Sequence, residues 1–352
     1  MADSQNTGTT RGLLERLNEG PVVCAEGYLF ELERRGYLQA GSFVPEVVLD
    51  HPEVMEQVHR DFTHAGSDIQ QAFTYNGTRE KMRIMGKEDK LEPLNRNALR
   101  IARKVARETD TLLAGNICNS NVYDPENPDS VREAREMFEE QVQWAAEEGA
   151  DMVIAETYSW TGEAKMALDI IKKHNLPAVV TMAMHRAPHT RDGDTLPDAC
   201  KKLEDAGADV VGLNCMRGPW TMLETIKEVR QKCSGHVAAV PVPYRTNEEE
   251  PTFMALRDHV CPHHVPEGRP FPTALDPFLC NRYEVEDFTR QAHEAGVDYF
   301  GLCCGCQPHL LRSMAEALGR RPEASKYSPD MSKHAWFGQA ARDINKSFAD
   351  EL

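Results

Sequence analysis

A short pattern recurs four times in this chain and constrains its fold more than any other feature. It reads HAGSDI at 64–69, EEGADMVI at 147–154, DAGADVVG at 205–212 and EAGVDYFG at 294–301. In each copy a stretch with helical periodicity ends at a glycine, which suits the left-handed position after a helix, and an Asp and a β-rich run follow. Four such junctions predict a systematic alternation of helix and strand.

Counting the apolar runs along the chain predicts eight strands. Amphipathic stretches such as 130–148, 220–232 and 284–295 separate the runs, and no G-x-G-x-x-G fingerprint of dinucleotide binding follows any of them. Eight near-regular units favour a closed (β/α)8 TIM barrel, which needs about 250 residues plus insertions, over a doubly wound parallel sheet. The predicted strands are 21–26, 69–75, 111–118, 152–158, 178–184, 210–215, 236–242 and 298–304.

Three segments interrupt or follow this alternation. Residues 77–92 form a charged insertion after the second predicted strand, and residues 243–283 form a long proline-rich connection after the seventh. A connection of that length in a compact domain usually serves as a lid or a binding loop. We therefore expect one barrel domain over 1–320 and a polar C-terminal arm over 321–352 that packs on the barrel or on a partner subunit.

Charge and hydropathy exclude several classes of partner. The formal net charge is −16, whereas a nucleic-acid-binding domain usually has a basic face, and the same acidity disfavours binding to an anionic membrane surface. No apolar run approaches the ~20 residues that span a bilayer, and the polar start MADSQNTGTTRGLLERL lacks the apolar region of a signal peptide. We expect a cytoplasmic protein that binds neither nucleic acid nor membrane.

Cysteines gather at the predicted carboxyl ends of two strands, where barrel enzymes place their active sites. Cys215 ends the sixth predicted strand, and Cys303 and Cys304 end the eighth. Three thiolates on one rim make a soft site with an open fourth position, for which zinc is the expected metal. Spacing alone leaves zinc and core packing equally open, although adjacent residues on a strand face opposite ways. A vicinal disulfide is strained and disfavoured in a reducing compartment.

An open zinc–thiolate site can activate water, or it can bind and ionise a substrate thiol. Water activation normally uses His and carboxylate ligands, whereas an all-sulfur site suits a bound thiolate that stays nucleophilic. The softness of the site therefore indicates alkyl transfer to sulfur. One alternative is a zinc hydrolase or lyase, for which Glu156 is the candidate general base. Another is a catalytically inactive barrel whose thiols sense zinc or oxidation.

Other polar side chains lie at the same predicted strand ends. Asn214 precedes Cys215 and is placed to orient substrate or the metal ligands. We expect Gln71 to point inward and to form hydrogen bonds near the metal. His185 and Arg186 lie just beyond the fifth predicted strand, where they can contact a substrate carboxylate.

Five segments spread over nearly the whole chain carry a family resemblance. They are GLLERLNEGPVV (12–23), LERRGYLQAG (32–41), VVGLNC (210–215), FPTALDP (271–277) and YFGLCCGCQPHLLRSMAEAL (299–318). They resemble the betaine–homocysteine S-methyltransferases and the wider zinc-dependent homocysteine S-methyltransferase family. The resemblance implies a (β/α)8 barrel with a zinc ion on Cys215, Cys303 and Cys304, and it leaves Cys306 outside the ligand set.

Departures from the family pattern fall at the positions expected to hold the amino acid. The Asp-Gly-Gly turn of the betaine enzymes reads Ala25-Glu26-Gly27 here, so Glu26 is the candidate replacement for the family's Asp. Glu156 keeps the second acidic position, which the resemblance identifies as a ligand of the homocysteine amino group. These two glutamates are the candidate catalytic residues, and Gly27 and Tyr28 lie beside the first.

The aromatic cage that surrounds the quaternary ammonium in the betaine enzymes is also altered. Its Trp corresponds to Phe43, and its two tyrosines correspond to Asn76 and Thr157. A cation gains ~0.5–2 kcal/mol from each ring face, so the loss of two rings predicts weaker glycine betaine binding unless neighbouring tyrosines compensate. Side chains alternate faces along a strand, so neighbours are not automatic replacements. The expected substrate-binding residues are Gly27, Tyr28, Phe43, Gln71, Tyr75, Asn76, Thr157, Tyr158 and Asn214.

Together these features predict a zinc-dependent S-methyltransferase with two small-molecule partners. One is a thiol, which the resemblance identifies as homocysteine, and the other is a betaine-type or sulfonium methyl donor. A positively charged leaving group departs neutral and needs no protonation, which agrees with the lack of an obvious catalytic His. The C-terminal arm resembles part of a family segment used in subunit contacts, so we expect a homodimer.

Overall fold

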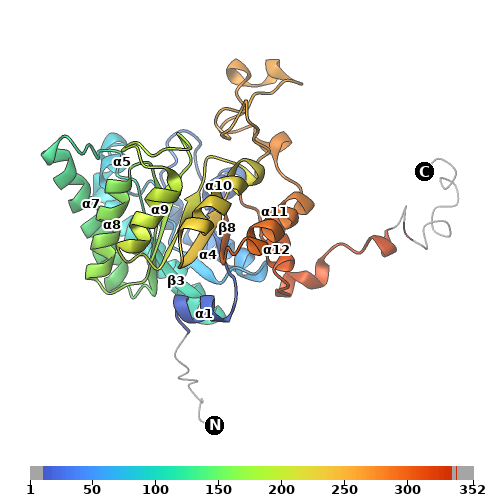
Figure 1. Cartoon of the computed structure of the whole chain (residues 1–352), viewed down its shortest axis with the longest axis horizontal. Helices are drawn as coiled ribbons and strands as arrows, with labels where there is room; N and C mark the ends of the chain where they lie inside the picture. The colour runs from blue at the N-terminus through green and yellow to red at the C-terminus, as the bar shows by residue number, and fades with distance from the viewer. Residues whose placement is uncertain (1–10, 335–337, 339–352) are drawn as a thin grey trace, which may run out of the picture.

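The structure is a computed structural model that describes residues 11–334 and residue 338, and it shows a closed barrel of parallel strands surrounded by helices (Figure 1). The strands pair in sequence order, and β8 closes the ring by pairing with β1. The predicted (β/α)8 barrel is confirmed. The strands are β1 (Val22–Ala25), β2 (Ile69–Gln71), β3 (Leu112–Cys118), β4 (Met152–Tyr158), β5 (Ala178–Ala183), β6 (Val210–Asn214), β7 (His236–Val240) and β8 (Tyr299–Leu302).

Helices cover the outside of the barrel, and α1 lies across its amino-terminal end, at the bottom of Figure 1. The helices expected at 130–148, 220–232 and 284–295 are α7, α10 and α11, each within two residues of its predicted ends. The helices are α1 (Leu13–Glu19), α2 (Tyr28–Arg34), α3 (Val47–Asp50), α4 (Pro52–His64), α5 (Arg79–Ile84), α6 (Leu91–Thr109), α7 (Pro128–Glu147), α8 (Thr161–Lys173), α9 (Leu196–Asp205), α10 (Pro219–Lys232), α11 (Arg282–Glu294) and α12 (Pro308–Ala317).

The four sequence repeats tie the strands together in pairs at the amino-terminal end of the barrel. The glycine of every repeat has a positive φ, between 75° and 113°, as a left-handed helix terminus requires. The aspartate carboxylate then accepts a hydrogen bond from a backbone N–H of the preceding strand, joining β1 to β2, β3 to β4, β5 to β6 and β7 to β8. The pairs are Asp68 with Val23 (2.8 Å), Asp151 with Leu113 (2.7 Å), Asp209 with Ala178 (2.7 Å) and Asp298 with Val237 (3.0 Å).

Two strands end earlier than the sequence predicts, at the end of the barrel that carries the candidate site. Strand β2 stops at Gln71 and β8 stops at Leu302, whereas the predicted strands ran to 75 and 304. The other strands agree with prediction within two residues at each end. Residues 72–76, Cys303 and Cys304 therefore lie in loops, so the alternation of faces along a strand does not decide where their side chains point.

The two insertions form short helical segments. Residues 77–92 contain α5 and the 3-10 turn η1 (Glu88–Lys90). The long connection 243–283 rises above the barrel in Figure 1, and its base is fixed by aromatic contacts. Phe253 packs against Phe30 of α2 (ring centroids 6.2 Å apart), Phe271 (5.1 Å) and Tyr244 (5.9 Å).

The predicted arm over 321–352 is only partly described, since residues 335–337 and 339–352 lie outside the described residues. Its first turn, η5 (Glu323–Tyr327), contacts α12, where Arg312 donates to the carbonyl of Ala324 at 3.2 Å. The domain division, the homodimer and the cytoplasmic location stay predictions. Within the described ranges no helix combines the length and the apolar character needed to cross a membrane.

Candidate metal and substrate site

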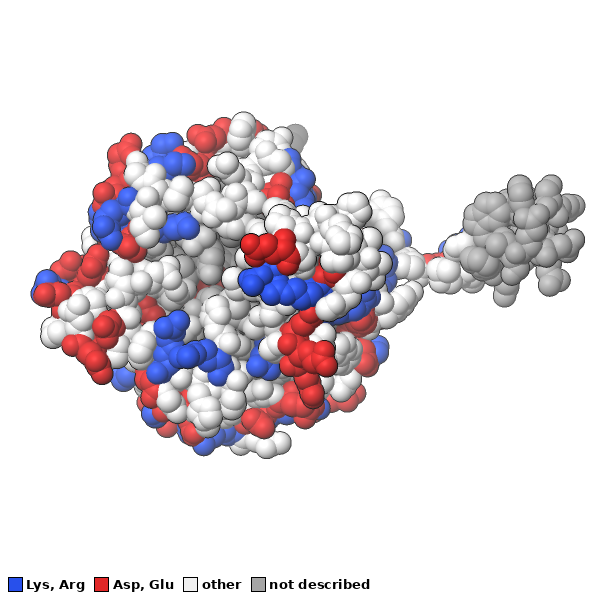
Figure 2. All heavy atoms as spheres, turned by 90° about the horizontal axis from the view of Figure 1, so that it is seen from above, with Lys and Arg blue, Asp and Glu red and all other residues white. Residues whose placement is uncertain are grey.

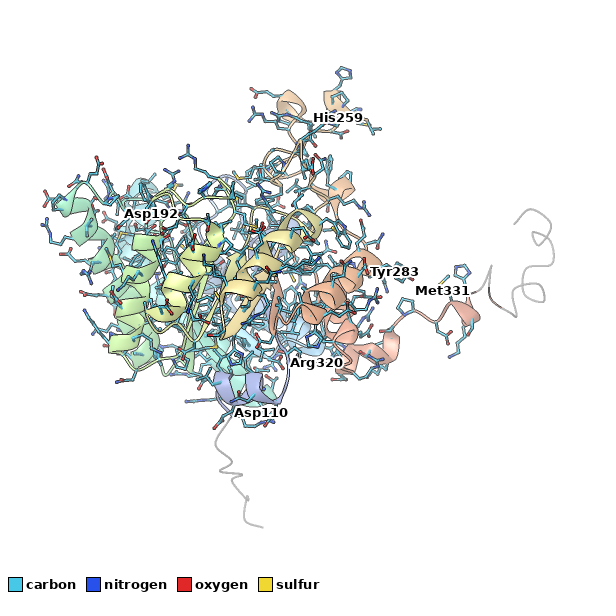
Figure 3. All side chains as sticks on the ribbon, in the orientation of Figure 1. Asp110, Asp192, His259, Tyr283, Arg320 and Met331 are labelled. Atoms are coloured by element: carbon cyan, nitrogen blue, oxygen red, sulfur yellow. The ribbon has the colours of Figure 1, made fainter. Side chains whose placement is uncertain are left out.

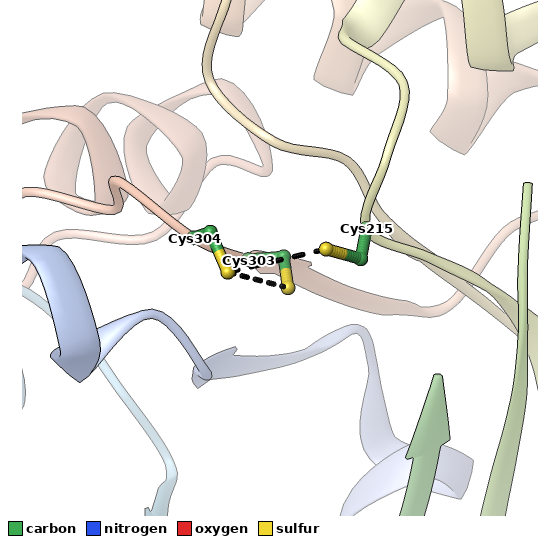
Figure 4. Close-up of side chains that lie close together, drawn as sticks. All are labelled: Cys215, Cys303 and Cys304. Atoms are coloured by element: carbon green, nitrogen blue, oxygen red, sulfur yellow. Dashed lines mark hydrogen bonds between the residues drawn. The ribbon is translucent and has the colours of Figure 1, made fainter. Parts of the chain in front are cut away.

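Three cysteines meet at the carboxyl-terminal end of the barrel (Figure 4). Cys215 follows β6, and Cys303 and Cys304 follow β8. The Sγ of Cys304 lies 3.9 Å from that of Cys215 and 3.9 Å from that of Cys303, and all three sulfur atoms lie within 4.8 Å of one another. All three are free thiols, so the cluster holds no vicinal disulfide.

The sulfur atoms have the spacing that a tetrahedral zinc site requires. With Zn–S bonds of about 2.3 Å, tetrahedral angles place two sulfur ligands about 3.8 Å apart. In the part of the chain that the structure describes, no second group of three His, Cys, Asp or Glu ligands is this compact. Cys215 and Cys303 are buried whereas Cys304 is half-buried, and both neighbouring thiols donate to its sulfur, which lowers the pKa of Cys304 well below its usual range. The three residues fit one metal ion.

Non-glycine residues at the site lie in the left-handed backbone region, one within β4 and two directly after β6. Thr157 has φ 67°, Cys215 has φ 58° and Met216 has φ 65°. For a β-branched residue such as Thr157 this conformation is a genuine outlier, and it persists only where neighbours hold it. Asn214 does so twice, accepting from the Thr157 N–H (3.0 Å) and donating to its Oγ1 (2.7 Å). Asn214 thus fixes the turn that follows Glu156.

Glu156 lies on β4 with both carboxylate oxygens engaged. Its Oε1 accepts from Gln71 (2.8 Å) and Asn116 (2.7 Å), and its Oε2 accepts from Asn214 (3.1 Å) and Thr157 (3.2 Å). Burial, and then the charge of Cys303, raise the pKa of Glu156 above its usual value. These four hydrogen bonds hold the carboxylate in one orientation beside the thiols.

Glu26 differs from Glu156 because one of its oxygens has no partner. Its Oε1 accepts from Tyr299 at 3.1 Å, whereas its Oε2 is buried without a hydrogen bond. Burial first, and the charge of Glu156 second, raise the pKa of Glu26. The Gln71 Oε1 and the Tyr28 Oη in the same pocket are also buried and unpartnered. Buried polar groups are normally satisfied, so this acceptor set suits a ligand that brings several N–H donors, such as an ammonium group.

These side chains line a cavity that opens to solvent, with about 370 Å³ of empty space when its open mouth is included. Three aromatic residues, Tyr28, Phe73 and Tyr75, form part of its wall, and their faces can attract a cation. The structure therefore brings together the cysteines and several residues that the sequence predicted. The predicted residues that line the cavity are Glu26, Tyr28, Gln71, Tyr75, Glu156, Thr157, Cys215, Cys303 and Cys304.

Other predicted residues do not line this cavity. Tyr158 packs outward against Phe138 of α7, with ring centroids 6.0 Å apart. Phe43 packs on Phe30 (5.9 Å), and its carbonyl accepts from the Asn76 side chain at 3.3 Å. None of Tyr158, Phe43 and Asn76 lines the cavity. Asn214 acts through Glu156 and Thr157.

Gly27 is required for close packing between the first and last strands. A Cβ at Gly27 would lie 2.2 Å from the Cys303 carbonyl oxygen. Only glycine allows the loop after β8 to approach α2 this closely. Gly27 thereby sets the position of Cys303 instead of contacting a ligand in the cavity.

Sequence reasoning missed Asn116 and Phe73, which both line the cavity. Asn116 donates to Glu156 from the neighbouring strand β3. It lies two residues before the end of its strand, a spacing that places it on the same face as Cys118. The polar residue within the apolar run TLLAGNIC was the available signal.

Comparisons with known proteins agree with this geometry. The family model described as homocysteine S-methyltransferase matches residues 24–318. The S-methylmethionine–homocysteine S-methyltransferase of Pongo abelii is 35% identical over 97% of this chain and 90% of its own length. The betaine–homocysteine S-methyltransferase 1 of Danio rerio is 35% identical over 94% of this chain and 81% of its own. The metallated form of the Escherichia coli homocysteine methyltransferase MmuM has the same fold, with a TM-score of 0.67 at 18% identity over 86% of this chain and 98% of its own.

Proposed function

This chain belongs to the homocysteine S-methyltransferase family and is a methyltransferase, and on that premise we propose that it uses one zinc ion to move a methyl group from an onium donor to the thiol of homocysteine. Cys215, Cys303 and Cys304 hold the zinc in this proposal. The observation that carries it is the sulfur spacing of 3.9 Å at the wall of a cavity with unpartnered acceptors. Zinc, when bound, lowers the pKa of a substrate thiol and keeps it ionised.

The amino group of homocysteine binds to residues of this chain. An ammonium has three N–H donors, and Glu26 Oε2, Gln71 Oε1 and Tyr28 Oη are the unpartnered acceptors in the cavity. Burial, and then the charge of Glu156, raise the pKa of Glu26, and the positive charge of the ligand stabilises the ionised form of Glu26. Glu156 keeps Gln71 in place through its 2.8 Å hydrogen bond.

The donor lies against the aromatic wall. Tyr28, Phe73 and Tyr75 can attract its positive charge, at ~0.5–2 kcal/mol for each ring face. The thiolate sulfur attacks the methyl carbon, a carbon–sulfur bond forms, and the bond from that carbon to the onium nitrogen or sulfur breaks. The electron pair of the broken bond neutralises the leaving group, so the reaction needs no general acid. Two relatives of equal identity are named for S-methylmethionine and for betaine, so both donor types are candidates.

The two alternative functions receive less support. A zinc hydrolase or lyase needs a general base, and the candidate Glu156 already accepts four hydrogen bonds from protein groups. A sensor of zinc or oxidation needs no cavity, yet the thiols form part of the wall of a cavity that also contains unpartnered acceptors.

A methyl-transfer assay tests the proposal. Zinc-loaded protein is mixed with homocysteine whose carbon chain is labelled with heavy carbon and, separately, with betaine or S-methylmethionine carrying deuterated methyl groups. Mass spectrometry is expected to find methionine that carries both labels for at least one donor, and none after removal of zinc by a chelator. Zinc-replete protein that forms no methionine with any onium donor contradicts the proposal, and donor breakdown without homocysteine supports the hydrolase instead.

A further inference from the structure

A second pocket lies at the same end of the barrel as the three cysteines. It is formed by three successive loops, which follow β3, β4 and β5. It shares no lining residue with the cavity of the metal site. The two pockets are nevertheless close along the chain: Asn116 lines the first and Asn119 the second, and Thr157 lines the first and Ser159 the second. The lining residues are Asn119, Asn121, Tyr123, Ser159, Trp160, Glu163, His185 and Arg191.

Hydrogen bonds fix the three loops to one another. The Asp192 carboxylate accepts from the backbone N–H groups of Thr161 and Gly162, both at 2.8 Å, and it thereby holds the loop after β5 over the first turn of α8. Glu163 Oε1 accepts from the Ser120 N–H (2.7 Å) and hydroxyl (2.6 Å), and it holds the loop after β3. The pocket is therefore preformed.

Two basic side chains, His185 and Arg191, line this pocket together with the acidic Glu163. Burial raises the pKa of Glu163 and the charge of Arg191 opposes that rise, while Ser120 occupies the Glu163 Oε1. The guanidinium of Arg191 lies 6.0 Å from the centre of the Trp160 ring, and Tyr123 packs edge-to-face with that ring, with the ring centroids 5.9 Å apart. Among the residues that the structure describes, neither Arg191 nor His185 forms a side-chain hydrogen bond or an ion pair. Burial, and then the charge of Arg191, lower the pKa of His185, so the two groups are within electrostatic reach of each other.

The surroundings make this basic pair unusual. The chain carries a net charge of −16, which repels anions at long range. Figure 3 shows Asp192, the neighbour of Arg191, at the end of the molecule opposite Asp110. Figure 2 looks down on this end, where both basic and acidic side chains lie around a hollow. An unpaired guanidinium backed by an aromatic ring, with amide and hydroxyl donors nearby, has the chemistry that recognises a carboxylate.

We infer that this pocket binds the carboxylate group of a substrate on its way to the three-cysteine site, with Arg191 as the main contact. The inference rests on the proposed function. Homocysteine, betaine and S-methylmethionine all carry a carboxylate, so the shared chemistry defines the ligand. A carboxylate held here keeps the substrate beside the three-cysteine site, because the two pockets begin only a few residues apart on the same strands. The pocket then acts on substrate capture and leaves the methyl-transfer step unchanged.

Steady-state kinetics of Arg191→Gln test the inference for each substrate in turn. The KM of either the donor or homocysteine is expected to rise about tenfold, which corresponds to about 1.4 kcal/mol, while kcat stays unchanged. Arg191→Lys keeps the charge and is expected to recover most of the loss. Arg107→Gln is the matched control, because Arg107 is exposed on α6 at the opposite end of the barrel and forms no ion pair with any residue that the structure describes.

The fluorescence of Trp160 gives a second readout that does not need turnover. Titration with betaine, S-methylmethionine or homocysteine is expected to change the emission of Trp160. This emission is the part of the protein fluorescence that is lost in Trp160→Phe. Choline has the trimethylammonium group of betaine without its carboxylate and is expected to leave that signal unchanged.

The outcomes separate this inference from the proposed function. Methionine formation with no change in any KM in Arg191→Gln overturns the inference and leaves the function standing. An equal response of Trp160 to choline and to the carboxylates also overturns it. A rise in one KM identifies which substrate supplies the carboxylate.

Discussion

Cys304 is the thiol of the cluster that both other cysteines contact and the one with most exposure to solvent. We predict that Cys304→Ser lowers zinc affinity by at least about 100-fold, because one of three thiolate ligands is lost, and abolishes methyl transfer. Cys306→Ser is the matched control, since Cys306 is buried two residues away but lies outside the cluster. Zinc content after dialysis, measured by mass spectrometry, should be near zero in the first variant and unchanged in the second. Equal loss in both would show that the cluster is not the metal site.

Glu26 has an unpartnered oxygen in the cavity. The contribution of Glu26 to substrate binding should therefore depend on the amino group of the substrate. We predict that Glu26→Gln raises the KM for homocysteine about 10- to 100-fold, because a charge-assisted hydrogen bond contributes about 1.5–3 kcal/mol. The KM for 4-mercaptobutyrate, which is homocysteine without its amino group, should not change. An equal rise for both thiols would mean that Glu26 acts on something other than the ammonium.

Residue types alone predicted some of these contacts and not others. The thiols and both glutamates were identifiable, because strand ends gather at one rim of a barrel. The sequence predicted Thr157 at the site but not its positive φ. The register shift between Ala155 and Tyr158, which directs Tyr158 outward, was not predicted either. Such local backbone irregularities depend on tertiary contacts, here with Asn214, that are far apart in sequence.

At the scale of strands and helices, the aspartates of the four repeats join neighbouring strands. Asp209 accepts from the Ala178 N–H at 2.7 Å and pairs with Lys172 at 2.9 Å. We predict that Asp209→Ala lowers the free energy of unfolding by about 1–3 kcal/mol, because a backbone donor at the start of β5 loses its partner. The kcat of this variant should not change.

Asp205→Ala is the control for this element. Asp205 lies four residues earlier, at the end of α9, and forms an ion pair with Lys201 on the helix surface, which contributes at most about 0.5 kcal/mol. Urea denaturation compares the two variants. Equal midpoints for Asp209→Ala and Asp205→Ala would argue against a special role for the repeat aspartates.

The periodicity of the chain predicted every strand, because the helix–strand junction has a signature that is local in sequence. Strand ends at the site were harder to predict. The segment 69–75 reads as one strand, yet β2 ends at Gln71. The residues after it belong to the site loops, where side chains form hydrogen bonds across the barrel: the Thr74 hydroxyl donates to the Asn116 carbonyl at 2.7 Å.

At the scale of the whole molecule, barrel closure brings the metal ligands together. Strand β7 pairs with both β6 and β8, so the loops after β6 and β8 converge above it. Cys215 and Cys304 are 89 positions apart in sequence, and their sulfur atoms are 3.9 Å apart. The resemblance to a family predicted this pairing, whereas spacing alone did not decide between zinc and packing.

The stability of the whole barrel should depend on pH through His236, which lies at the start of β7 beside Asp298. The protonated His236 donates from Nδ1 to the Asp298 carboxylate, 2.5 Å away, and this hydrogen bond raises the pKa of His236 above its ordinary value. The charged form is thus favoured by folding. Its stabilisation is fully present below the ordinary pKa of about 6.5 and is lost as pH rises through the raised pKa.

The variant His236→Gln tests this linkage. Its deficit in unfolding free energy relative to the parent should be larger at about pH 5.5 than at about pH 8.5, since only the parent gains from protonation there. Urea denaturation at the two pH values measures the unfolding free energy of the parent and of the variant. A deficit that does not change with pH would contradict the assigned role of the His236–Asp298 pair.

The central claim is that the acceptor thiol binds to a zinc ion held by Cys215, Cys303 and Cys304. Zinc-edge X-ray absorption of the zinc-loaded protein, recorded before and after addition of homocysteine, tests it most directly. We predict three sulfur ligands with one lighter atom at first, and four sulfur ligands after homocysteine is added. A sulfur count that does not rise, although homocysteine binds to the protein, would contradict the account.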